Sequence, residues 1–249
     1  MPAAGTRHRS AARSITDPVT PIWHPSPNFG IRRDGLCPEL IVIHYTAMDS
    51  AGAALRRLCD ADAQVSAHFL IAGDGQVWQM VDETMRAWHA GAGQWQGRGD
   101  VNSRSIGIEL DNRGTHPFAQ PQMAALEALV TRLMARWRIA PQGVIGHSDM
   151  APQRKSDPGP RFDWRRLARQ GLAVWPEARN SATHGPDTDS DFLSNAARFG
   201  YPVDDAAATL AAFRARFRPQ ASGRLCWADR ALAADLARRF GVDGAAQST

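Results

Sequence analysis

The sequence predicts an α/β fold, in which a central mixed β-sheet is flanked by helices and a small C-terminal three-helix bundle follows. Over the first 170 residues or so, short runs rich in Ile and Val alternate with segments of helical periodicity. Such alternation is typical of helices packed on a sheet. A polar, turn-rich stretch then separates this part from about 55 residues of purely helical pattern, which favours a second, smaller unit.

The expected elements follow in order along the chain. Apolar, β-branched runs predict strands, and apolar residues at three- and four-residue steps predict helices. The expected strands are 40–46 (LIVIHYT), 105–110 (SIGIEL), 143–148 (GVIGHS) and a hairpin over 65–81 that turns at Gly73-Asp74-Gly75. The expected helices are 51–60, 121–138 with Pro121 in its first turn, 205–217, and short segments on either side of the last.

These elements divide the chain into four regions. We expect a flexible N-terminal arm over residues 1–20 and an α/β domain over 21–175. A linker over 176–190 leads to a helical domain over 191–245.

Composition excludes several classes of protein. The 249 residues carry a net charge of +4, and the 29 Lys and Arg are scattered, which argues against nucleic-acid binding. No segment approaches the ~18 apolar residues of a membrane span. The N-terminus lacks the apolar core of a secretory signal, so we expect a cytoplasmic protein, with export to the periplasm or cell envelope by an unrecognised route as the alternative. The three cysteines form no C-x-x-C pair, and the oligomeric state is left open.

Two histidines stand where metal ligands are often found. His44 follows the apolar run LIVI, and His147 follows VIG in the same way. Asp157 lies further on, in a loop rich in Pro and Gly. Two imidazoles and one carboxylate leave the fourth position of Zn²⁺ open, which is the catalytic arrangement. Spacing alone leaves a second interpretation open, in which both histidines are hydrogen-bonded core residues and Asp157 caps a loop.

Five segments in this order carry a resemblance to a known family. They are IVIHYTA, SAHFLIAGDGQVWQMV, AWHAG, SIGIELDN and GHSDMAPQRKSDPGPRFDW. They look like the N-acetylmuramoyl-L-alanine amidase type 2 family, and they are most similar to its AmpD/AmiD-like bacterial branch. The resemblance spans roughly residues 22–168. The tail LSNAARFGYPVDDAAATLAAFRARFRP resembles, more weakly, the three-helix peptidoglycan-binding domain.

The resemblance implies a reaction and a site. The reaction is hydrolysis of the amide bond between N-acetylmuramic acid and L-alanine in peptidoglycan or muropeptides. The site is one Zn²⁺ per chain on His44, His147 and Asp157, with Glu109 and Lys155 acting beside it. Glu109 would move a proton from water to the leaving amine, and Lys155 would stabilise the oxyanion. Without the resemblance, Glu109 reads as a solvated charge and Lys155 as a surface lysine.

Four further residues are expected near the substrate. The resemblance places His68 and His89 there, although a hydrogen-bonded core histidine is a competing interpretation of His68. Trp95 and Asn102 lie on a Gly-rich loop that would rim the groove, where an indole can pack on a sugar or peptide, or can instead anchor the loop.

The sequence departs from the phage and animal branch of the family at two positions. That branch has Tyr just before the histidine that matches His68, and Cys as its third ligand; here Ala67 and Asp157 stand there. The tyrosine role therefore does not carry over, and more of the base role falls on Glu109.

The sequence leaves two alternatives open. A non-catalytic peptidoglycan-recognition module is the competing function, which the complete set of ligands disfavours. The substrate is either a soluble anhydro-muropeptide, favoured by the missing signal peptide, or the wall polymer, favoured by the tail.

Overall fold

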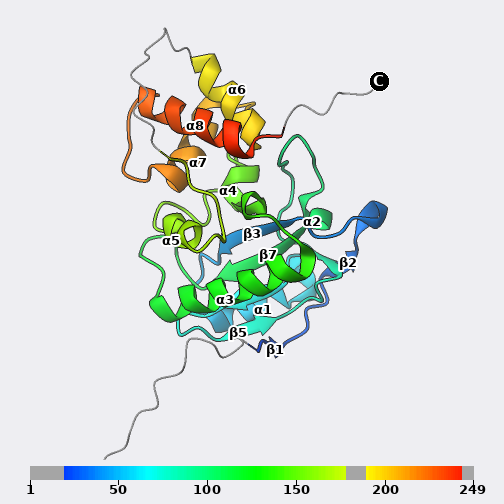
Figure 1. Cartoon of the computed structure of the whole chain (residues 1–249). Helices are drawn as coiled ribbons and strands as arrows, with labels where there is room; N and C mark the ends of the chain where they lie inside the picture. The colour runs from blue at the N-terminus through cyan, green and yellow to red at the C-terminus, as the bar shows by residue number, and fades with distance from the viewer. Residues whose placement is uncertain (1–19, 178–188, 243–249) are drawn as a thin grey trace, which may run out of the picture.

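The computed structural model describes residues 20–177 and 189–242, and a six-stranded mixed sheet lies at its centre (Figure 1). The strand order is β1-β5-β4-β7-β3-β8. The strands are β1 (Ile22–Trp23), β3 (Leu40–Tyr45), β4 (Phe69–Ile71), β5 (Val77–Gln79), β7 (Ser105–Leu110) and β8 (Val144–Gly146). Strands β4, β7, β3 and β8 run parallel, whereas β5 is antiparallel to β4. A separate antiparallel ribbon pairs β2 (Phe29–Ile31) with β6 (Met85–Ala87).

Helices cover both faces of the sheet, and three more follow at the C-terminus. The first group is α1 (Ala51–Leu58), α2 (Val101–Arg104), α3 (Gln120–Trp137), α4 (His147–Met150) and α5 (Trp164–Arg169). The second group is α6 (Asp189–Phe199), α7 (Ala206–Phe217) and α8 (Trp227–Phe240), which we call the C-terminal helical unit. Short 3₁₀ turns lie at Arg33–Gly35, Ala61–Ala63 and Pro141–Gly143.

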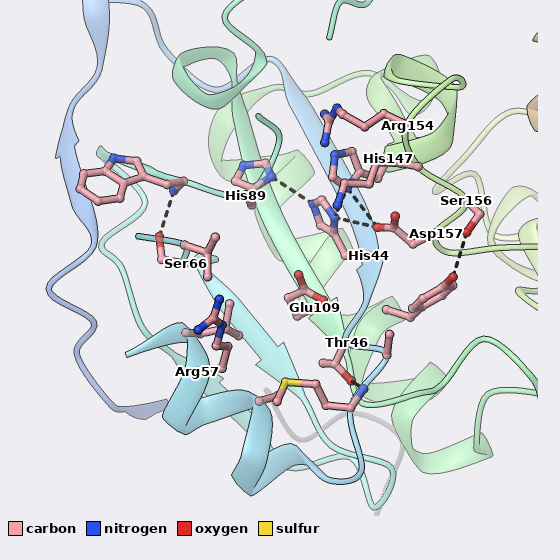
Figure 2. A pocket seen from close by; sticks show the side chains of 18 residues that line it. His44, Thr46, Arg57, Ser66, His89, Glu109, His147, Arg154, Ser156 and Asp157 are labelled. Atoms are coloured by element: carbon pink, nitrogen blue, oxygen red, sulfur yellow. Dashed lines mark hydrogen bonds and ion pairs between the residues drawn. The ribbon is translucent and has the colours of Figure 1, made fainter. Parts of the chain in front are cut away.

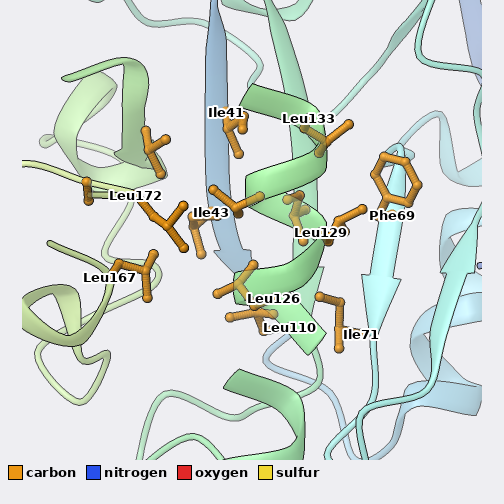
Figure 3. Close-up of a cluster of buried hydrophobic side chains, with 14 of the residues drawn as sticks. Ile41, Ile43, Phe69, Ile71, Leu110, Leu126, Leu129, Leu133, Leu167 and Leu172 are labelled. Carbon is orange, nitrogen blue, oxygen red and sulfur yellow. The ribbon is translucent and has the colours of Figure 1, made fainter. Parts of the chain in front are cut away.

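The alternation of side chains along a strand assigns each residue of the sheet to one face. One face packs on α3 and α5, as Figure 3 shows for Ile41, Ile43 and Leu129. Its buried members include Ile41, Ile43, Phe69, Ile71, Ile106, Ile108, Leu110, Leu126, Leu129, Leu133 and Leu167. The neighbouring positions His44 on β3 and Glu109 on β7 are paired in register and therefore share the opposite face.

Different elements cover the two halves of that opposite face, one near β4 and the other near β3 and β8. Helix α1 packs on the β4 side, where Ala54 and Leu58 meet Leu70 and Met80. The C-terminal helical unit packs on the β3 and β8 side; its core cluster with the sheet includes Leu40, Val42, Ile145, Phe199, Phe213, Phe217 and Leu236. The polar end of the face, with His44 and Glu109, lies between these two covers.

The expected elements are confirmed with small shifts in their ends. The predicted strand 143–148 stops at Gly146, and His147 instead begins the short helix α4. Strands β1, β2 and β6 were not expected, because two or three residues, partly exposed, show no readable periodicity.

The expected division into domains is altered in one respect. Helix α6 begins at Asp189, inside the predicted linker 176–190, and residues 1–19, 178–188 and 243–249 lie outside the described residues. The three C-terminal helices are present, but their core is continuous with that of the sheet. Among the described helices, none is long and apolar enough to cross a membrane.

Candidate metal centre and active site

His44, His147 and Asp157 converge on one point above the sheet edge (Figure 2). His44 lies near the end of β3, His147 begins α4, and Asp157 lies in the loop that follows α4. The Nδ1 atoms of the two histidines are 3.0 Å apart. Asp157 Oδ2 lies 2.9 Å from His44 Nδ1 and 3.1 Å from His147 Nδ1. The three residues are between 2% and 7% exposed, so water is largely excluded from between them.

The outer nitrogen of each imidazole shows where its proton lies. His147 Nε2 is 2.9 Å from the carbonyl oxygen of Ala90, so Nε2 donates, and in the neutral tautomer Nδ1 then carries the lone pair. His44 Nε2 is 3.0 Å from His89 Nδ1. Burial and the neighbouring His147 lower the pKa of His44 to about 4, which keeps its ring neutral.

A short chain of hydrogen bonds then orients His44 through His89. Ser105 Oγ donates to the carbonyl oxygen of Val101 at 2.5 Å, and therefore accepts from His89 Nε2 at 3.1 Å. Burial and His44 hold the pKa of His89 well below its usual range, so its Nδ1 is free to accept from His44 Nε2–H. A Cβ on Gly107 would lie 2.4 Å from His89 Cγ, so only glycine leaves room for this ring.

The convergent atoms therefore fit a metal ion. With both rings neutral and protonated on Nε2, His44 Nδ1, His147 Nδ1 and Asp157 Oδ2 present lone pairs to one another at about 3 Å, an arrangement that is repulsive without a cation. Ligands in a zinc tetrahedron with bonds of about 2.0 Å lie about 3.3 Å apart. Two imidazoles and one carboxylate, with the outer ring nitrogens hydrogen-bonded, match a catalytic zinc site.

Glu109 lies beside this cluster on β7. Its Oε2 atom is enclosed by protein and has no hydrogen-bond partner in the described part of the chain. Burial, followed by the charge of Asp157, raises the pKa of Glu109 to about 8, against the opposing effect of Lys155. A carboxyl that is free to take up and release a proton near neutral pH is suited to general acid–base catalysis.

These groups lie in an open pocket of about 370 Å³, a size that suits part of a small glycopeptide. The pocket is lined by His44, His89, Glu109, His147, Lys155 and Asp157, among others. Lys155 is thus brought to the site as expected. Arg57 from α1 and Arg154 were not expected from the sequence, since an arginine in a helix or loop carries no sign of facing a pocket. Arg154 donates to the carbonyl oxygens of Ala90 and Ala92.

His68 and Asn102 lie behind the site, where they hold other groups in place. His68 is fully buried; its Nδ1 accepts from the Gly107 N–H at 3.0 Å, and its Nε2 lies 3.1 Å from the carbonyl oxygen of Met85. Neither residue lines the pocket. Asn102 Oδ1 accepts from the backbone N–H groups of His89 and Ala90. The expected direct contact with substrate is corrected for both, because both side chains are enclosed by protein.

Trp95 is also corrected. The sequence placed its indole at the rim of the groove, but the side chain is 0% exposed. It packs edge-on against Phe199 and Tyr201 of the C-terminal part, at centroid distances of 5.5 and 5.4 Å. The indole anchors the Gly-rich loop, which is the competing interpretation that the sequence had left open.

An α/β sheet that presents three possible metal donors and the Glu109 carboxyl to one open pocket is the arrangement that a metal-dependent hydrolase requires. The family model described as N-acetylmuramoyl-L-alanine amidase matches residues 8–160. The chain is 37% identical over 235 residues to the N-acetylmuramoyl-L-alanine amidase AmiD of Escherichia coli, covering 82% of this chain and 84% of that protein. It is 38% identical over 160 residues to the 1,6-anhydro-N-acetylmuramyl-L-alanine amidase AmpD of Enterobacter cloacae, covering 57% and 86%.

Solved structures agree with these relatives. The structure of E. coli AmiD with anhydro-N-acetylmuramic acid-L-Ala-D-γ-Glu-L-Lys has a TM-score of 0.76 and 36% identity, and covers 85% of this chain and 93% of that one. AmpDh3 of Pseudomonas aeruginosa has a TM-score of 0.74 and 28% identity, and covers 95% and 99%. The chain belongs to the N-acetylmuramoyl-L-alanine amidase family, and it is a peptidoglycan amidase.

Ser105→Ala is expected to weaken zinc binding by about 10-fold. Loss of a hydrogen-bond partner behind a metal ligand typically lowers metal affinity by about 10- to 100-fold, and Ser105 acts on His44 only through His89. Without the hydroxyl, His89 Nε2–H loses its acceptor, and His89 can present a proton to His44 instead of a lone pair. The measurement is the zinc dissociation constant by competition with a chelator. Ser103→Ala is the matched control, because Ser103 is equally buried but bonds to Arg33 and Arg86. Equal zinc affinity in Ser105→Ala and Ser103→Ala would show that the hydrogen bonds from Ser105 through His89 to His44 do not contribute to zinc binding.

Proposed function

We propose that this amidase uses one Zn²⁺ on His44, His147 and Asp157 to release the L-Ala peptide from an anhydro-muropeptide. The observation that carries the proposal is the convergence of three possible metal donors in the pocket, beside Glu109, whose Oε2 atom is buried without a hydrogen-bond partner in the described chain. The substrate class is supported by two relatives, since AmiD and AmpDh3 are each described in complex with an anhydro-muropeptide.

Each group near the three donors has a distinct task in the reaction. When bound, Zn²⁺ supplies Lewis-acid chemistry, lowering the pKa of water and polarising a carbonyl group. Glu109 takes a proton from the attacking water and returns it to the amide nitrogen of the departing L-Ala peptide. Lys155, which lines the same pocket, stabilises the negative charge that develops on the carbonyl oxygen. His89 and Ser105 keep His44 in the tautomer that presents Nδ1.

The outer wall of the pocket suits an acidic peptide. The γ-linked D-Glu in the peptide bound to AmiD leaves a free α-carboxylate. Arg57 on α1 lines the pocket and makes no hydrogen bond or ion pair with the rest of the described chain. Its guanidinium is therefore available to a substrate carboxylate, whereas Arg154 is engaged by two carbonyl oxygens.

The C-terminal helical unit is proposed to hold polymeric peptidoglycan as well. Support comes from the resemblance of ARFGYPV and FRARF to a peptidoglycan-binding domain. A shallow groove between α6 and α7 offers a surface for it, lined by Phe192, Leu193, Ala206, Ala207, Leu210, Arg224 and Leu225. Retention of polymer would raise the local concentration of substrate at the pocket.

The test is amide cleavage by the purified full chain on MurNAc-tripeptide, on the 1,6-anhydro form and on intact sacculi. Each substrate is assayed after removal of metal by a chelator and again after addition of Zn²⁺. We expect zinc-dependent release of L-Ala peptide, with one Zn²⁺ bound per chain and the anhydro-muropeptide cut fastest. Co-sedimentation with sacculi measures retention of polymer separately.

The outcomes separate the alternatives. Preference for sacculi over the anhydro-muropeptide would move the substrate class to wall polymer. Binding of Zn²⁺ with no cleavage of any substrate would contradict the amidase and favour the recognition module. Cleavage that is unaffected by removal of metal would contradict the zinc assignment.

A further inference from the structure

The C-terminal helical unit reaches the back of the metal centre through a buried ion pair. Arg216 of α7 donates to Asp149 Oδ2 of α4 at 2.6 Å, and the two residues are only 2% and 1% exposed. Tyr201, between α6 and α7, donates its hydroxyl proton to Asp149 Oδ1 at 2.6 Å. Burial and the charge of Asp149 raise the pKa of Tyr201 well above its usual value, so the hydroxyl keeps this proton.

These contacts hold the backbone immediately before His147. Asp149 Oδ2 also accepts from the N–H of Gly146 at 2.8 Å. Arg216 donates in addition to the carbonyl oxygen of Val144 at 3.1 Å. The turn from β8 into α4 is therefore held on its strand side and its helix side by one charged pair. Because His147 is the first residue of α4, the direction of its imidazole depends on this turn.

A second contact holds the Gly-rich loop over residues 90–102, in which the carbonyl oxygen of Ala90 accepts a hydrogen bond from His147. Trp95, in the middle of this loop, is fully buried against Phe199 and Tyr201. Gly200 makes this packing possible, because a Cβ there would lie 2.7 Å from Trp95 Cε2, and its φ of +144° also favours glycine. The same loop begins at Ala90, whose carbonyl oxygen accepts from His147 Nε2.

We propose that the C-terminal helical unit positions the metal ligand His147, with Arg216 and Tyr201 as its positioning residues. The unit sets the backbone of His147 through Asp149 and sets the acceptor of its Nε2–H through Trp95. This inference rests on the zinc function proposed above. A ligand held in place by outer contacts binds metal more tightly, and removing one partner of a buried ion pair leaves an uncompensated charge that disturbs its surroundings.

The test uses Arg216→Met and Tyr201→Phe in the full chain, with the zinc dissociation constant as the readout. Arg216→Met is expected to raise that constant by about 10- to 100-fold. Tyr201→Phe removes only one hydroxyl and is expected to raise it by about 3-fold, which keeps the test decisive if Arg216→Met does not fold. Thermal unfolding of the metal-free proteins is measured in parallel.

Arg214→Met is the matched control. Arg214 lies on the same helix and pairs with Asp229 inside the C-terminal helical unit, away from α4. It is expected to lower the Tm of the metal-free protein while leaving the zinc dissociation constant of the folded protein within about 2-fold of wild type. Unchanged zinc affinity in Arg216→Met and Tyr201→Phe would overturn the inference, as would an equal loss in Arg214→Met. A wild-type protein that binds no zinc would instead overturn the proposed function.

Discussion

Glu109→Gln is expected to lower kcat by about 10²- to 10⁴-fold while leaving zinc affinity within a few-fold of wild type. Glutamine has nearly the same shape, but it cannot take a proton from water or return one to the leaving amine. Glu109 is not one of the three convergent donors, so the metal should stay. The measurements are kcat on the anhydro-muropeptide and the zinc content of the purified variant.

Asp111→Asn is the matched control for this variant. Asp111 lies just beyond β7, outside the pocket, so the same exchange of carboxylate for amide should leave kcat nearly unchanged. A Glu109→Gln enzyme that keeps more than about a tenth of the wild-type kcat would assign the proton transfer to another group.

The same variant is expected to stabilise the metal-free protein at alkaline pH. The pKa of Glu109 is raised to about 8 in the folded state, so the folded protein binds more protons than the unfolded chain between about pH 4.5 and 8. Stability contributed by this group is therefore complete below pH 4.5 and is lost as pH rises through 8. Glutamine has no such loss, so metal-free Glu109→Gln should exceed the wild-type Tm by about 5 °C or more at pH 8 and by much less at pH 5. An identical difference in Tm between the variant and wild type at pH 5 and pH 8 would show that ionisation of Glu109 does not destabilise the metal-free protein.

The sheet and the metal donors could be predicted because both depend on local patterns. The run from Leu40 to Ile43 is apolar and largely β-branched, and the histidine that follows it directly is one of the three donors. Period-two alternation in β7 then places Glu109 on the same face as His44. The resemblance to the amidase family added the reaction and the assignment of Zn²⁺, which spacing alone left open.

The groups behind the donors could not be predicted, because they meet only through the tertiary fold. Ser105 and His89 are sixteen positions apart, and their hydrogen bond depends on the close approach of the loop over Gly107. For Trp95, the sequence could not show whether the indole is exposed or buried. An aromatic residue in a Gly-rich loop gives the same sequence pattern whether it lies exposed at the rim of a groove or buried beneath the groove. The packing partner of Trp95, Phe199, lies about a hundred residues further along the chain. Nothing in the sequence of α7 indicates that Arg216 is buried, because its ion-pair partner Asp149 lies on α4, far away in the sequence.

Asp157→Ala is expected to weaken zinc binding by more than about 100-fold, beyond the range for outer-shell changes, and to abolish turnover at limiting zinc. The variant removes the one carboxylate among the three convergent donors and leaves two imidazoles whose Nδ1 atoms are 3.0 Å apart. The fold should persist, because the backbone carbonyl of Asp157 still accepts from the N–H of Ser148. Zinc stoichiometry after dialysis against a weak chelator and cleavage of the anhydro-muropeptide are the two measurements.

Asp163→Asn is the control for this loss of charge, since Asp163 lies in the same loop but caps α5 instead of facing the pocket. Asparagine is also a good N-cap, so zinc content and turnover should both match wild type. Retention of one tightly bound Zn²⁺ in Asp157→Ala would remove the carboxylate from the donor set. Loss of zinc together with unchanged turnover would separate the metal from the reaction. Only joint loss in Asp157→Ala, with neither changed in Asp163→Asn, ties hydrolysis to the three donors that the fold brings together.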